Sequence, residues 1–170
     1  RDNEIIIPTG KVEIYPGDDI YICIKNNDLL RALRVFGIKS QENRKVVIVG
    51  AGNVGFNIIK IIERDYPEIS CKIIDNNLEK TKLISSKLSN QNTILYGDVL
   101  DTAILKEAGV SGAEAIISVT DDDETNIFAS LLAKDLGCKR SMAIVSNENY
   151  RRLSKKLTLD VLINPGNITT

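Results

Sequence analysis

Apolar and polar residues alternate in two different periodic patterns along most of this chain. Short apolar runs rich in Val and Ile recur at regular intervals, and between them apolar residues return every three or four positions, the period of a half-buried helix. The apolar runs predict six strands, over residues 45–50, 71–75, 93–96, 114–119, 141–146 and 160–164. The intervening segments predict helices over residues 53–65, 78–89, 101–108, 124–137 and 148–156.

Two of these helices show a clear apolar face. In the first, the face consists of Val54, Ile58, Ile61 and Ile62. In the fourth, it consists of Phe128, Leu131, Leu132 and Leu136, with Gly137 placed as the C-cap. Alternating strands and helices need right-handed crossovers, which build a parallel sheet covered by helices on both faces. The predicted fold is therefore α/β, a Rossmann-like doubly wound parallel sheet.

The first part of the chain has a different pattern. Residues 1–25 contain short strand-like runs broken by Pro and Gly, too few to hold a core alone, so we interpret them as the closing strands of a preceding domain. Residues 26–43 predict a short helix and a polar linker, and residues 44–170 form the main domain. We expect the chain to be a piece of a longer protein.

Composition narrows the function classes. With a net charge of −1, the chain is not expected to bind nucleic acid, and it has no apolar run near the ~18 residues that span a bilayer, so direct membrane insertion is not expected. Cys23, Cys71 and Cys138 are widely spaced in apolar runs and are predicted to be buried, reduced thiols without metal-binding spacing. The pattern indicates a cytoplasmic protein without a metal site.

Candidate catalytic groups are scarce. The chain has no histidine, the commonest general acid or base. Tyr21 and Lys25 have the Tyr-x-x-x-Lys spacing of short-chain dehydrogenases, but they lie in a strand pattern. Four residues along a strand separate the two side chains by about 13 Å, too far to cooperate. We therefore reject this pair and predict no catalytic residue.

The most informative feature is the run Val-Val-Ile-Val-Gly-Ala-Gly at residues 46–52, followed by a glycine three positions later. Gly50 permits the tight strand-to-helix turn, Gly52 lets the backbone approach a pyrophosphate, and Gly55 lets the helix pack close to the sheet. The free N–H groups of the helix N-terminus then face the phosphates. The candidate phosphate-binding residues are Gly50, Ala51, Gly52, Asn53, Val54 and Gly55.

A candidate ribose-binding acid follows the second strand. Asp75 ends that strand 20 residues after Gly55, where an acid accepts hydrogen bonds from both ribose hydroxyls. The alternative is a surface acid at a strand end. If Asp75 does bind the ribose, its negative charge favours NAD(H) or an adenosine nucleotide over NADP, because it would repel a 2′-phosphate. Lys80 lies nearby and could partly offset that repulsion. Asn76, next to Asp75, is a further candidate contact.

Polar residues also follow the third and fourth strands. Asp98 either reaches the adenosine end of the ligand or caps the next helix. Thr120-x-x-Asp123 and Asp121-x-x-Glu124 both match a capping box. Because the loop lies beside the glycine turn, Thr120 and Asp121 are also candidates for contact with ribose or phosphate. A cation site is disfavoured, since the spacing is not that of a calcium loop.

Together these motifs resemble the nucleotide-binding RCK or KTN domain of TrkA-type potassium transport regulators. The resemblance covers about residues 44–165 and is more specific than the glycine motif alone. It rests on the glycine run with Ile74-Asp75, on Gly97-Asp98 with Leu105 and Ala108-Gly109-Val110, on Ala115–Thr120 with Asp123-Glu124-Thr125-Asn126, and on Ile163-Asn164-Pro165.

The resemblance implies a regulatory, non-enzymatic subunit at the cytoplasmic face of the membrane, attached through a potassium channel or transporter. It implies binding of NAD(H), or of ATP, ADP or AMP, and dimers formed through residues 124–156. It also identifies residues 1–25 with the end of a C-terminal RCK subdomain, and thus a tandem protein. The chain departs from the family at Met142-Ala143-Ile144, where an arginine is frequent, which leaves the ligand's identity open.

Two rival functions remain open from the sequence. One is an NAD-dependent oxidoreductase, which would need a substrate domain and a proton-transfer group from outside this chain. The other is a degenerate copy that serves only as a scaffold, against which the complete glycine motif and Asp75 argue.

Overall fold

The computed structural model describes residues 9–10, 12–15, 25, 28, 31–32, 35–36, 44–150 and 157–165. The chain divides into two compact units, Arg1–Gln41 and Glu42–Thr170. Within the first unit, the backbone N–H of Val12 donates to the carbonyl of Thr9 at 3.0 Å in a turn. The β fragment and linker helix expected for this unit lie largely outside the described residues.

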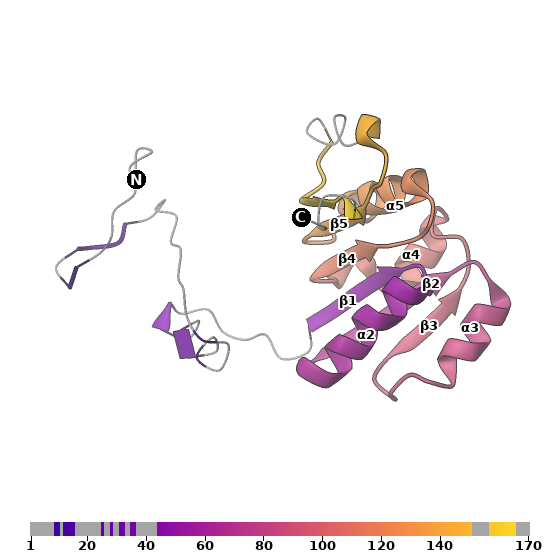
Figure 1. The fold of residues 1–170 in the computed structure, drawn as a ribbon, viewed down its shortest axis with the longest axis horizontal. Helices are drawn as coiled ribbons and strands as arrows, with labels where there is room; N and C mark the ends of the chain where they lie inside the picture. Colours follow the sequence, from indigo (N-terminus) through magenta and orange to yellow (C-terminus); the bar gives the residue numbers. More distant parts are fainter. Residues whose placement is uncertain are drawn as a thin grey trace. The chain divides into compact units, whose positions relative to one another are not determined.

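The second unit is built on a parallel sheet of six described strands (Figure 1). The strands run in the order β3-β2-β1-β4-β5-β6, and every neighbouring pair is parallel. All six predicted strands are confirmed, with ends that differ from the prediction by no more than two residues. Their bounds are β1 Arg44–Val49, β2 Ile69–Asp75, β3 Thr93–Tyr96, β4 Ala115–Ser118, β5 Ser141–Ile144 and β6 Val161–Ile163.

The helices alternate with the strands as predicted. They are α2 Asn53–Asp65, α3 Leu78–Ser85, α4 Thr102–Ala108, α5 Asp123–Asp135 and a short 3₁₀ helix η2 Val110–Gly112. The helix predicted over 78–89 ends early, because its last part is rich in Ser and Asn, which bond to their own backbone. The Ser86 hydroxyl, for example, donates to the Leu83 carbonyl at 2.9 Å. Of the helix predicted over 148–156, residues 151–156 lie outside the described part.

Both faces of the sheet carry a hydrophobic core, which confirms the doubly wound architecture. On one face Val47 and Val49 of β1 pack against α4 and α5, and on the other Val46 and Ile48 pack against α2 and α3 (Figure 1). Because consecutive strand residues point to opposite faces, a central strand covered on both sides must be apolar throughout. This explains why the strand before the glycine turn is an unbroken apolar run.

The predicted apolar faces of two helices were partly wrong. Helix α2 buries the predicted Ile62 and packs the predicted Ile58 partly buried against the core, but it leaves Val54 48% and Ile61 47% exposed and buries Gly55 and Ile59 in their place. Helix α5 buries its smaller residues against the sheet and leaves Phe128 55% exposed, while the three leucines are partly buried. Close approach of α5 to β4 and β5 requires small side chains, so the largest apolar residue is turned outward. The buried residues of α5 are Asn126, Ile127, Ala129, Ser130 and Ala133.

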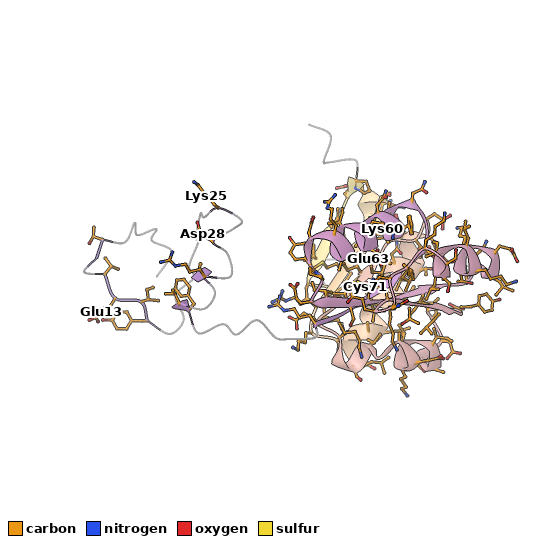
Figure 2. All side chains as sticks on the ribbon, turned by 90° about the horizontal axis from the view of Figure 1, so that it is seen from below. Glu13, Lys25, Asp28, Lys60, Glu63 and Cys71 are labelled. Atoms are coloured by element: carbon orange, nitrogen blue, oxygen red, sulfur yellow. The ribbon has the colours of Figure 1, made fainter. Side chains whose placement is uncertain are left out.

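A polar cluster joins α2 to the neighbouring part of the sheet. Glu63 accepts hydrogen bonds from Lys60 Nζ at 2.8 Å, from Ser89 N at 2.8 Å and from Asn92 Nδ2 at 2.8 Å. Asn92 in turn accepts from the backbone N–H of Cys71 at 2.7 Å, and Figure 2 labels Lys60, Glu63 and Cys71 in this region. Cys71 is buried, as predicted, and burial and the charge of Glu63 raise the pKa of its thiol to about 12, so the thiol is unreactive.

Glu63 makes the stability of the domain depend on acid pH. Partial burial opposes its ionisation, but the hydrogen bonds from Lys60, Ser89 and Asn92 outweigh that effect and lower its pKa from 4.5 to about 2. A depressed folded-state pKa adds stability that is fully present above pH 4.5 and is lost as the pH falls through about 2. We expect the unfolding free energy of Glu63→Gln, measured by urea denaturation, to depend less on pH between these two values than that of the original chain. An unchanged pH profile would contradict this role.

Candidate functional site

A cleft of about 500 Å³ opens at the carboxyl ends of the strands, where the order reverses between β1 and β4. Ligands of open α/β sheets bind at this kind of switch point, and the volume lies in the range of small-molecule sites. Eight of the predicted site residues line it: Gly50, Gly52, Val54, Asp75, Asn76, Asp98, Thr120 and Asp121. The others, Ala51, Asn53 and Gly55, do not line the cleft but lie in or beside the turn that shapes it.

The glycines of the turn have three different physical roles. Gly50 has a φ of +99°, and a Cβ there would lie 3.1 Å from the backbone N of Thr120. A Cβ on Gly55 would lie 1.9 Å from the carbonyl oxygen of Gly50, so only glycine allows α2 to begin this close to the turn. A Cβ on Gly52 would meet no protein atom within 4 Å. It would project into open space beside the cleft, which fits a position reserved for close approach of a ligand.

The N-terminus of α2 is open toward this turn. Helices α3, α4 and α5 each have a side-chain N-cap, from Asn77, Asp101 and Asp122 respectively. Helix α2 has Gly52 at that position, no side-chain hydrogen bond to its first N–H groups, and no acidic residue in its first turn. Uncapped N–H groups at a helix start attract anions, so this part of the cleft is chemically suited to an anionic group.

Asp75 holds the turn in place. One carboxylate oxygen accepts the backbone N–H of Ala51 at 2.6 Å, and the other accepts the N–H of Asn77 at 2.8 Å. The side chain is 8% exposed, yet it lines the cleft. Each carboxylate oxygen can accept a second hydrogen bond, so the predicted ribose contact remains available. The sequence did not reveal this structural role, because the partner N–H of Ala51 lies 24 positions away in the chain.

The prediction that Asp98 could cap the next helix was wrong. Asp101 caps α4 by accepting from the N–H of Ala103 at 2.8 Å, because the helix begins one residue later than predicted. Asp98 instead accepts from the N–H of Leu100 at 2.9 Å in a tight turn, and it lines the cleft together with Lys80. The adenosine-end alternative for Asp98 stays a prediction.

The cap of α5 also differs from the two predicted capping boxes. Asp122, and neither Thr120 nor Asp121, is the N-cap, and it accepts from the N–H groups of Glu124 and Thr125 at 3.3 and 3.1 Å. Hydrogen bonds from the hydroxyl and N–H of Thr125 lower the pKa of Asp122, so it is ionised at neutral pH. Thr120 and Asp121 are thereby left on the cleft wall.

Asn126 fixes this wall and was not among the predicted site residues. It is fully buried, and its Oδ1 accepts from both N and Oγ1 of Thr120, at 2.8 and 2.7 Å. Its Nδ2 donates to the carbonyls of Thr120 and Ile144, both at 3.0 Å. A polar residue one turn into an apolar helix was the signal that could have identified it. Asn126 therefore ties the cleft to the end of β5.

Two neighbouring features complete the site. Asp123 accepts from the backbone N–H groups of Ser146 and Asn147, which anchors the loop after β5 to the start of α5. Ala143 of β5 is buried, and no residue of β5 lines the cleft. Among the residues that the structure describes, no group of three potential ligands could hold a metal ion. In the same residues, no helix is both long and apolar enough to cross a membrane.

The fold and the cleft define the class: a Rossmann-type domain with a glycine-rich turn at its switch point. The model of the TrkA-N domain family matches residues 46–165. The chain belongs to this family, as the resemblance in its motifs indicates.

Individual proteins agree with this assignment. The chain is 31% identical to the Trk system potassium uptake protein TrkA of Azorhizobium caulinodans over 169 residues, 99% of this chain and 37% of that protein. It thus spans just over a third of the length of this relative. The GsuK RCK domain superposes with a TM-score of 0.63 at 25% identity, covering 82% of this chain and 29% of the other.

Two ligand-bound structures share the fold. GsuK bound to ADP gives a TM-score of 0.60 at 26% identity, covering 82% of this chain and 36% of that one. The GsuK channel bound to NAD gives a TM-score of 0.61 at 15% identity, covering 80% of this chain and 28% of that one.

Proposed function

We propose that this domain is the nucleotide-sensing part of a regulatory subunit that controls a potassium transporter or channel. It binds NAD(H) or an adenine nucleotide and does not transform it. The observation that carries the proposal is the open N-terminus of α2 above a glycine turn whose middle glycine faces the cleft. Family membership supports it, as do a relative named as a potassium uptake protein and a GsuK structure that holds ADP.

The proposed ligand lies across the switch point. The pyrophosphate binds the N–H groups at the start of α2 beside Gly52, the adenosine half lies toward Asp75, Asn76 and Asp98, and the other half lies toward Thr120 and Asp121. This polarity follows from the acid at the end of β2, which binds the adenosine ribose in domains of this type. The other loop residues, Gly50, Ala51, Asn53, Val54 and Gly55, shape the turn around the phosphates.

Regulation follows from differential binding. A nucleotide that binds one arrangement of the full assembly better than another shifts the population toward it. We propose that the assembly contains dimers formed through residues 124–156, and the exposed Phe128 on α5 supports this choice of surface. We further propose that residues 1–25 close a preceding RCK subdomain, that 26–43 link it to the domain at 44–170, and that the protein works at the cytoplasmic face of the membrane.

Isothermal titration of this chain with NAD⁺, NADH, NADPH, ATP and ADP tests the proposal. We expect micromolar binding of at least one ligand without turnover, and a large loss of affinity in Gly52→Ala, whose Cβ would occupy the space meant for phosphate. The matched control is Asn57→Ala, an exposed α2 position outside the cleft. A folded chain that binds none of the ligands would favour the scaffold function, and nicotinamide reduction with a substrate would favour the oxidoreductase.

Asp75→Ala is expected to weaken nucleotide binding by about 1–3 kcal/mol through loss of charge-assisted hydrogen bonds. Because Asp75 also holds Ala51, a loss alone would not show a ribose contact. A double-mutant cycle separates the two roles. Removing both adenosine ribose hydroxyls from the ligand should weaken binding to the original chain but not to Asp75→Ala. Equal losses in both proteins would refute the ribose contact.

A further inference from the structure

Helix α5 presents a row of polar side chains to the sheet. Asn126, Ser130 and Lys134 are spaced four residues apart, so they lie on one face of the helix over about 12 Å. Asn126 and Ser130 are fully buried, whereas the buried residues of α2 and α4 are apolar or glycine. Buried polar side chains lower stability unless they find hydrogen-bond partners. These three residues, here called the polar row, must therefore bond within the layer between α5 and the sheet.

The buried members of the polar row contact the last part of β5. Asn126 Nδ2 donates to the carbonyl of Ile144 at 3.0 Å, at the end of the strand. One turn later in α5, the Ser130 hydroxyl donates to the carbonyl of Met142 at 3.4 Å. Among the residues that the structure describes, no buried side-chain N or O atom lacks a partner. A buried polar network that is satisfied in this way fixes one arrangement of the elements that it joins.

The last member of the polar row also reaches the edge strand β6. Lys134 Nζ donates to the carbonyl of Lys139 at 3.0 Å and lies 3.0 Å from Oδ2 of Asp160. The same carboxylate oxygen accepts the backbone N–H of Ser141 at 2.7 Å. Asp160 directly precedes β6, and Ser141 begins β5. The polar row thus connects the start of β6 to the cleft wall, which its first member holds at Thr120.

These contacts make the packing of α5 on β5 all-or-none. Hydrogen bonds weaken steeply when their distances and angles change, whereas apolar contacts are non-directional. A shift of α5 along β5 would break the contacts of the whole row together and would leave buried groups of both elements without partners. Helix α5, β5 and the start of β6 are therefore expected to separate from one another in a single step.

We propose that α5, β5 and β6 open as one cooperative unit, in which the polar row couples the cleft wall at Thr120 to the edge strand β6. The regulatory consequence rests on the proposed function, since it requires a nucleotide in the cleft. A nucleotide that holds the wall in place also slows the opening of β6. By reciprocity, a contact that stabilises β6 raises the affinity of the cleft by the same factor. Occupancy of the cleft is thus passed to the far edge of the sheet.

Native-state hydrogen exchange of the chain without ligand tests the cooperative unit. Lys134→Met keeps the apolar stem of the side chain and removes the contacts at the base of the row. We expect exchange to become about fivefold faster, as for loss of a partly exposed ion pair, in β6 and also at the backbone N–H of Thr120. The matched control is Lys106→Met, the same change at the exposed last-turn lysine of α4, which should alter neither rate.

Ser130→Ala removes the middle of the row and provides a second variant. In that background, Lys134→Met should still speed exchange in β6 but no longer at Thr120, as a double-mutant cycle measures. If Lys134→Met alone speeds exchange in β6 and leaves the rate at Thr120 unchanged, the cooperative unit is refuted. A response at Thr120 that survives Ser130→Ala would overturn the role of the polar row.

Adding NAD⁺ or ADP at saturation tests the link to the ligand. The nucleotide that binds should slow exchange in β6 about fivefold, the lower end of the usual coupling between two sites, in the original chain but not in Ser130→Ala. Binding without slower exchange in β6 would overturn the coupling and leave the proposed function intact. Absence of binding would overturn the proposed function, and the link to the ligand with it, while the exchange without ligand would still decide the cooperative unit.

Discussion

Replacing Gly55 with alanine is expected to lower the unfolding free energy by about 3 kcal/mol, the upper end of the range for forced overpacking. The new Cβ would lie 1.9 Å from the carbonyl oxygen of Gly50 and 3.4 Å from a side-chain methyl of Ile48. The first of these is backbone, which cannot rotate away, so α2 must move off the sheet. Nucleotide binding should fall as well, since the start of α2 would leave the turn.

Urea denaturation of the original chain and of Gly55→Ala measures this loss of unfolding free energy. Gly112→Ala serves as the control, because a Cβ there meets nothing within 4 Å, and it should change stability by less than about 1 kcal/mol. Gly52→Ala should also keep the fold while losing ligand affinity. If Gly55→Ala proved as stable as Gly112→Ala, the close contact between α2 and the turn would not be a constraint on this position.

Replacing Asn126 with alanine is expected to cost about 3 kcal/mol of stability, since it leaves several buried polar groups without partners. The groups that lose their partner are the N–H and carbonyl of Thr120 and the carbonyl of Ile144, whereas the Thr120 hydroxyl keeps its hydrogen bonds with Asp122. With this anchor removed, the cleft wall at Thr120–Asp122 is no longer held, so affinity for the nucleotide should fall in the molecules that remain folded.

Thermal or urea denaturation of Asn126→Ala measures the loss of stability, and titration with nucleotide measures the loss of affinity. Asn57→Ala is again a suitable control, as the same chemical change at an exposed position of α2 should be nearly neutral. Asn126→Asp keeps the size and the acceptor oxygen but turns a carboxylate oxygen toward two carbonyls, so it should be destabilised too. A stable Asn126→Ala protein with unchanged affinity would show that the wall is held by other contacts.

The architecture could be predicted because its signals are local and repeated. The apolar runs located all six strands, and the glycine spacing located the turn that the structure places at the switch point. The packing surfaces were less predictable. Hydrophobicity alone selects Phe128 for the core, whereas α5 needs small residues such as Ala129 and Ala133 to approach the sheet, and that distance is set by the whole layer.

The site shows the same division. Most predicted residues line the cleft, because the ends of parallel strands bring them together. The cap of α5 could not be chosen from sequence, because adjacent polar residues from Thr120 onward all suit a cap and only the exact start of the helix selects Asp122. Asn126 was missed because its partners lie 6 and 18 positions away, a relation that no local pattern records.

The uncapped start of α2 also has a thermodynamic consequence. The first N–H groups of α2 have no side-chain cap, so the domain without ligand lacks these hydrogen bonds, and an anionic ligand would supply them. Binding and folding are then linked: a ligand at a hundred times its dissociation constant adds about 2.7 kcal/mol to the stability of the folded state. The melting temperature of this domain would therefore rise with the free concentration of its nucleotide, and would serve as a direct gauge of it.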